Sequence, residues 1–186
     1  RVYWKNEKSM RASMGDELYE RYLAETRAWT DETVYANLGS WIMLSEDGQT
    51  WSLPVRVPVT APHGPIRQES GRLLYLGKAI ATGSGFHKTL QGAGIQCHAS
   101  EDEGRTWTLL GEVPLEDGTE EANYHEPHLV ELPSGKMVGL IRYQHSAAVK
   151  KHHPFTIFQS ESMDGGRTWS QAWPTGVKGS PPHLLL

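Results

Sequence analysis

Three copies of one short motif constrain the fold of this chain more than any other feature. They occupy residues 45–51, 100–107 and 162–169, and each runs from a serine through an aspartate and a glycine to a Thr-Trp pair. The aspartate can accept backbone N–H groups, the glycine can take a positive φ, and the tryptophan can pack the returning chain on a core. Each copy therefore predicts a tight turn that closes a β-hairpin.

The spacing of the motif predicts a repeating architecture. The three tryptophans lie 56 and 62 residues apart. Between the turns, a second repeat gives a proline-led strand, a glycine turn and an apolar strand at residues 65–76 and 127–141, and it begins again at Pro182. Four strands in a period of about 60 residues are typical of one β-propeller blade. We therefore expect an all-β propeller with about three blades present, so that a longer chain or several chains would complete the ring.

One segment departs from the β pattern. Residues 13–28 place Met14, Leu18 and Tyr22 at helical spacing, and Ser13 with Asp16 resembles a capping box. We expect a helical insertion that packs on the side of the propeller, with a lid or a subunit contact as the alternative.

Composition excludes several classes of protein. The 186 residues carry a formal charge of −4 without a basic block, which argues against nucleic acid as a partner. We expect no membrane-spanning segment, because no run approaches the roughly 18 apolar residues that a membrane helix needs. The one cysteine, Cys97, excludes an internal disulfide framework and leaves the compartment open.

The three turns resemble the Asp boxes of sialidases (neuraminidases) and their relatives with BNR repeats. The second and third copies match the Ser-x-Asp-x-Gly-x-Thr-Trp pattern in full, and the first is one residue short between Asp47 and Thr50. The resemblance implies a six-bladed propeller, of which residues 1–186 would form a part. Asp boxes lie at blade edges in this family, so we expect them to be structural.

Residues 123–142 resemble a second part of the sialidase pattern. Glu126 and Arg142 are sixteen residues apart, as are a catalytic glutamate and a carboxylate-binding arginine of that family. The resemblance implies a retaining exo-α-sialidase in which Glu126 is the base for a tyrosine nucleophile and Arg142 grips the substrate carboxylate. That tyrosine, two further arginines and the acid/base aspartate would lie outside this segment. A structural ion pair between Glu126 and Arg142 is the alternative.

Histidines recur around the prolines that begin the inner strands. We expect His63 and His125 to occupy equivalent places in consecutive blades and to contact substrate, with scaffold or metal-binding roles as alternatives. We predict no cofactor and no metal. Tyr124 is expected to line the site or to pack in the core.

Two other functions stay open at this level. One is a propeller enzyme that acts on uronate or deoxy-sugar polysaccharides, and the other is a non-catalytic glycan-binding propeller. Each of these functions takes a glycan as its partner. The family resemblance alone favours a secreted or periplasmic location, and the sequence leaves the oligomeric state undetermined.

Overall fold

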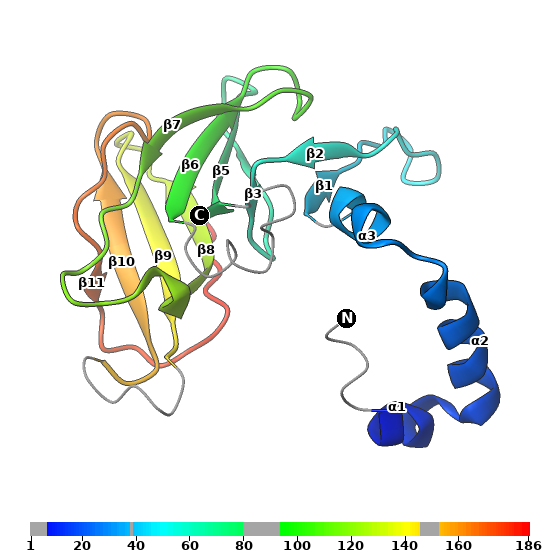
Figure 1. The fold of residues 1–186 in the computed structure, drawn as a ribbon. Helices are drawn as coiled ribbons and strands as arrows, with labels where there is room; N and C mark the ends of the chain where they lie inside the picture. The colour runs from blue at the N-terminus through cyan, green and yellow to red at the C-terminus, as the bar shows by residue number, and fades with distance from the viewer. Residues whose placement is uncertain (1–6, 38, 80–93, 146–152) are drawn as a thin grey trace. The chain divides into compact units, whose positions relative to one another are not determined.

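A computed structural model describes residues 7–37, 39–79, 94–145 and 153–186 of the chain. The chain divides into two compact units, Arg1–Leu38 and Gly39–Leu186. The first unit contains the helices α1 Glu7–Met14, α2 Asp16–Arg27 and α3 Asp31–Asn37, and the second contains the β-sheets (Figure 1). A single partial-propeller domain over residues 1–186 stays a prediction.

Arg11 joins the first two helices. Its guanidinium lies 2.5–3.0 Å from the carboxylates of Glu7, Asp16 and Glu20. The helix predicted at residues 13–28 falls largely on α2, and helical structure extends to both sides of it. The predicted capping box is wrong, because Gly15 is the N-cap residue of α2 and no side chain caps the helix there.

The first large sheet has the strand order expected of a blade. Its strands are β3 Val59–Thr60, β4 Ile66–Arg67, β5 Leu73–Ala79, β6 Ile95–Ser100 and β7 Thr108–Glu112. Both β3 and β4 pair with β5, which pairs with β6, which in turn pairs with β7, all antiparallel. Almost every residue of β5 is buried, whereas the outer strand β7 is mostly exposed. The inner strand β5 therefore belongs to the core, and β7 forms the outer edge of the sheet.

The second large sheet repeats the pattern. Its strands are β8 Tyr124–Glu131, β9 Met137–Tyr143, β10 Thr156–Ser162 and β11 Trp173–Pro174, in the order β11-β10-β9-β8. Buried and partly exposed positions alternate strictly along β9, as the period of a strand requires. Ile141 and Tyr143 therefore face the core, and Arg142 between them faces the other way.

A smaller hairpin precedes these sheets. It pairs β1 Ser40–Ile42 with β2 Val55–Val57, and the first Asp box lies between the two strands. The third strand repeat, expected from Pro182, forms no strand in the described residues. The described residues thus form two large sheets and one two-stranded sheet.

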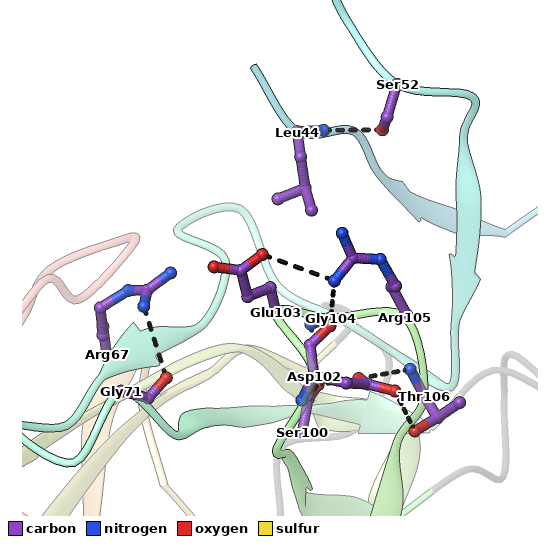
Figure 2. A network of polar contacts seen from close by, with 10 residues as sticks. All are labelled: Leu44, Ser52, Arg67, Gly71, Ser100, Asp102, Glu103, Gly104, Arg105 and Thr106. Atoms are coloured by element: carbon purple, nitrogen blue, oxygen red, sulfur yellow. Dashed lines mark hydrogen bonds and ion pairs between the residues drawn. The ribbon is translucent and has the colours of Figure 1, made fainter. Parts of the chain in front are cut away.

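All three Asp boxes form the predicted turn. In the second box, Asp102 accepts the Thr106 N–H and hydroxyl at 2.8 and 2.6 Å, and Ser100 accepts the Gly104 N–H at 2.7 Å (Figure 2). The same contacts recur at Asp47 and Asp164. Hydrogen bonds from Thr106 lower the pKa of Asp102 to about 2, so the carboxylate is ionised at neutral pH.

The boxes also pack one sheet on the next. Gly166 of the third box lies so close to β6 that an added Cβ would stand 2.8 Å from the Cys97 sulfur. Trp169 of the same box is only 6% exposed and belongs to the main core cluster, which both large sheets share. Trp51 of the first box is 58% exposed, so the predicted core packing of the tryptophan does not hold there.

Candidate functional site

The candidate site begins at an irregularity in strand β8. The β8–β9 register shifts between His125 and His128, so Glu126 and Pro127 form a bulge. Pro127 has no N–H to donate to the ladder, and Glu126 takes a φ of 49°. A positive φ in a glutamate costs about 1–3 kcal/mol, and strained residues of this kind cluster at functional sites. The Glu-Pro pair within a strand was the sequence signal for this bulge.

The bulge directs the Glu126 carboxylate to Arg142. The Arg142 Nη1 donates to one Glu126 oxygen at 2.7 Å, and Ser180 donates its hydroxyl to the other at 3.1 Å. Arg142 Nη2 donates to the side-chain oxygen of Gln144. The side chains of Arg142 and Glu126 are 25% and 32% exposed. The ion pair is therefore accessible to solvent.

The rest of the Arg142 guanidinium is less accessible than the pair. Its Nε atom is buried and makes no hydrogen bond. The guanidinium carbon lies 6.0 Å from the ring centre of Phe155, within the range of a cation–π contact. Phe155 also lines a cavity of about 350 Å³ together with His153 and Lys178. Phe155 thus lies between Arg142 and this cavity, which Arg142 itself does not line.

Glu126 is ionised at neutral pH. Its partial burial, the largest influence, raises the pKa, but hydrogen bonds from Arg142 and Ser180 and the positive charge of Arg142 together outweigh it. The net result is a pKa below the ordinary value of 4.5. An ionised carboxylate can accept a proton but has none to give, so the geometry suits a base.

His125 lies on the same strand, directly opposite Arg142 in the ladder. Burial lowers the pKa of His125, and the positive charges of Lys78 and Arg142 lower it further. Lys78 is held in place because its ammonium donates to the backbone oxygens of Glu121 and Tyr124 at 3.1 and 3.0 Å. His125 is consequently a neutral imidazole at pH 7, able to donate or to accept a hydrogen bond.

A second group of side chains is a histidine cluster formed by His63, His128 and His183. The His128 and His183 rings stack with centres 4.4 Å apart, and His63 lies 4.6 Å from His183 and 5.1 Å from His128. His63 sits in a loop that Tyr75 anchors through two 2.9 Å hydrogen bonds with the backbone of Ala61. The cluster therefore joins three segments that are far apart in the sequence.

The structure brings together most of the residues predicted for the site. Glu126, Arg142 and His125 are neighbours, and the charge of Glu126 acts on His63. His63 and His125 do not play equivalent parts, because His63 packs on His128 and His183 instead. The three clustered residues His63, His128 and His183 share a sequence signal, because each follows a proline.

Two further residues bear on the predicted set, because one of the two alternatives for Tyr124 is decided and Ser180 is added to the site. Tyr124 is fully buried against Tyr143 and Phe158, and its pKa is raised to about 12, chiefly by burial. It is a core residue rather than a site residue. Ser180 was not predicted, because nothing local marks a serine 54 positions away from Glu126 as its partner.

The described residues show neither a metal site nor a membrane-spanning helix. Within the described ranges, no group of three or more His, Cys, Asp or Glu side chains has the arrangement of a metal site. Among the helices of that part of the chain, none is long and apolar enough to cross a membrane.

Comparisons with known proteins agree with this architecture. The sequence profile of the BNR repeat-like domain matches residues 13–181. No curated protein sequence is significantly similar to the chain.

Solved structures resemble the chain over about three quarters of its length. A protein of unknown function from Dyadobacter fermentans superposes with a TM-score of 0.61 at 20% identity, over 77% of this chain and 40% of that one. The NanB sialidase from Streptococcus pneumoniae gives 0.50 at 18% identity, over 75% and 19%. The α-L-arabinofuranosidase Arb93a from Fusarium graminearum gives 0.50 at 22% identity, over 73% and 41%.

These likenesses concern the fold. They confirm the predicted all-β propeller of the sialidase type, which is also the fold of related glycoside hydrolases. This chain spans less than half the length of each of the three solved structures and so covers only part of a propeller.

Proposed function

We propose that this chain, which belongs to the BNR repeat-like domain family, supplies part of the active site of a glycoside hydrolase that removes a terminal acidic sugar. In this proposal the enzyme is a retaining exo-α-sialidase. Glu126 is the base that takes the proton of a tyrosine nucleophile from another part of the protein. Arg142 binds the carboxylate of the sugar, while His63 and His125 contact its hydroxyl groups.

The ion pair between Glu126 and Arg142 is the observation that carries the proposal. A planar guanidinium has five N–H donors in a fork that matches a carboxylate. Arg142 donates one N–H from each terminal nitrogen to Glu126 and Gln144, so the terminal nitrogens carry further N–H groups with which to bind a carboxylate. Because the pair is partly exposed, an incoming carboxylate can reach the same guanidinium without unfolding the strand.

The protonation state of Glu126 supports its role as a base. Glu126 is ionised at neutral pH, and the arginine that lowers its pKa, and so weakens it as a base before substrate binds, is the one that would bind the substrate. When the substrate carboxylate engages Arg142, the guanidinium charge is shared and Glu126 becomes a stronger base. A neutral tyrosine suits this site because a carboxylate nucleophile would repel an anionic sugar.

The test measures hydrolysis of an α-linked sialoside by the full-length protein. E126Q and R142A should each lower kcat/KM by roughly a hundredfold or more, because each removes a group that acts in the transition state. The control is E161Q, since Glu161 pairs with Lys136 at 2.7 Å in the same sheet with similar exposure. Unchanged hydrolysis by E126Q and R142A would refute the assignment.

A second candidate is a propeller glycosidase with a different glycan as its substrate. The histidine cluster favours it, because the ring nitrogens of clustered histidines can hydrogen-bond to sugar hydroxyls as well as to a carboxylate. A panel of sialosides, uronate-containing polymers and arabino-oligosaccharides separates the two. Release from the neutral or uronate glycans alone would favour this candidate, and binding without release from any of them would indicate a glycan-binding module.

A further inference from the structure

The segment of residues 180–184 is attached to strand β8 by two side-chain hydrogen bonds. Ser180 donates its hydroxyl to the second oxygen of Glu126 at 3.1 Å. Leu184 donates its backbone N–H to Nδ1 of His128 at 3.0 Å. Between these two contacts, the His183 ring stacks on the His128 ring. The segment thus connects Glu126, the proposed base, with the histidine cluster.

The second contact requires one protonation state of His128. A nitrogen that accepts a backbone N–H cannot itself carry a proton, so the neutral ring must hold its proton on Nε2. Protonation at Nδ1 would place two N–H groups against each other and would replace an attraction by a repulsion. The Leu184 contact therefore exists only while His128 is neutral.

The surroundings of His128 keep it neutral. Its side chain is buried, with 5% of the residue exposed, and the rings that face it belong to His63 and His183. Burial, followed by the possible charges of His183 and His63, lowers the pKa of His128 from 6.5 to about 4. Glu126, on the same strand, acts in the opposite direction on His63.

We propose that His128 is a positioning residue for Glu126, because its neutral ring docks residues 180–184 and so holds the Ser180 hydroxyl on the second carboxylate oxygen. Arg142 and Ser180 then fix one oxygen each, and the Glu126 carboxylate has a single orientation. This inference rests on the proposed role of Glu126 as a base.

The inference predicts that docking weakens in acid. When residues 180–184 detach, the His128 ring is freed from its buried contacts and returns toward its ordinary pKa of 6.5. The undocked form therefore binds protons more readily, so docking loses stability as the pH falls from 6.5 toward about 4. Above pH 6.5 the docked form is fully favoured.

Two variants of His128 in the full-length protein separate positioning from bulk packing. H128N keeps an acceptor near the position of Nδ1 but cannot titrate, whereas H128L keeps similar bulk without an acceptor. The hydrogen-exchange protection factor of the Leu184 amide, corrected for the intrinsic rate at each pH, reports docking. The Val113 amide, which donates to the Ile95 oxygen at 2.9 Å in the other large sheet, is the control for global unfolding.

In the wild type, Leu184 protection should fall as the pH is lowered from 6.5 to 4 while Val113 protection stays constant. H128N should keep Leu184 protected over this range, and H128L should lose roughly tenfold in protection at every pH. The same acid dependence in H128N as in the wild type, or full protection in H128L, would overturn the docking.

Enzyme activity tests whether docking of residues 180–184 positions Glu126. H128L and S180A should each lower kcat by roughly tenfold with little change in KM, and H128N should restore most of the loss. Undocking in H128L with no effect on hydrolysis, in a protein that E126Q inactivates, would overturn the positioning role. If E126Q leaves hydrolysis unchanged, the proposed function fails instead, and Leu184 protection still decides the docking.

Discussion

Replacement of Gly111 by alanine should strongly destabilise the unit Gly39–Leu186, because the third Asp box leaves no room for a side chain at Gly111. Gly111 lies in β7, and a Cβ added to it would stand 2.8 Å from the Arg167 carbonyl carbon and 3.0 Å from the Gly166 oxygen. Optimal contacts between carbons are about 3.5–4.0 Å, so the two backbones would have to separate by about 1 Å.

The backbone of the third Asp box cannot move away from Gly111 easily. Its loop is held because Asp164 accepts the N–H groups of Arg167 and Thr168 at 3.1 and 2.8 Å. Overpacking against a fixed backbone costs typically 1–3 kcal/mol, and we expect about 3 kcal/mol for G111A. Separation of the backbones would also loosen the packing of Gly166 on Cys97 in the neighbouring sheet.

Urea denaturation followed by tryptophan fluorescence measures this effect. With an m-value of about 1–3 kcal/mol/M, a loss of about 3 kcal/mol lowers the midpoint by about 1 M or more. The matched control is G179A, because a Cβ at Gly179 meets no atom within 4 Å and its backbone needs no positive φ. G179A should change stability by no more than about 0.5 kcal/mol. If G111A unfolds with the same midpoint as the wild type, the close packing between box and strand is refuted.

Three further predictions concern a tryptophan pair, the ion pair and the cysteine. W169A should cost about 3–5 kcal/mol because Trp169 is buried in the core, whereas W51A should cost at most about 0.5 kcal/mol because Trp51 is 58% exposed; thermal or urea unfolding of both variants checks this. The lowered pKa of Glu126 means that its ion pair stabilises the protein above pH 4.5 and that this contribution disappears as the pH falls through the folded-state pKa. E126Q should therefore flatten the acid limb of a stability–pH curve, and an unchanged limb would contradict the pairing. Cys97 should resist a thiol reagent at pH 8 until the protein is unfolded, since burial raises its pKa to about 12; rapid labelling of the native protein would show otherwise.

The sequence by itself determined the repeating unit and its turns. Each Asp box is closed by contacts within five residues, such as those from Asp102 to Thr106, so residue types at fixed offsets suffice to predict it. Glu126 and Arg142 also meet through short-range pairing, because they lie on adjacent antiparallel strands joined by a short turn. Local hydrogen bonds and the pairing of consecutive strands follow directly from the order of the residues.

The tertiary structure alone decided what surrounds that pair. Ser180 reaches Glu126, and Leu184 reaches His128, over 54 and 56 residues. The Pro-His repeat was visible in the sequence, but its clustering depends on how the blades are placed around each other. The bulge that gives Glu126 a φ of 49° likewise arises from the register of two whole strands. Such contacts depend on the packing of distant segments, which no local pattern of residues specifies.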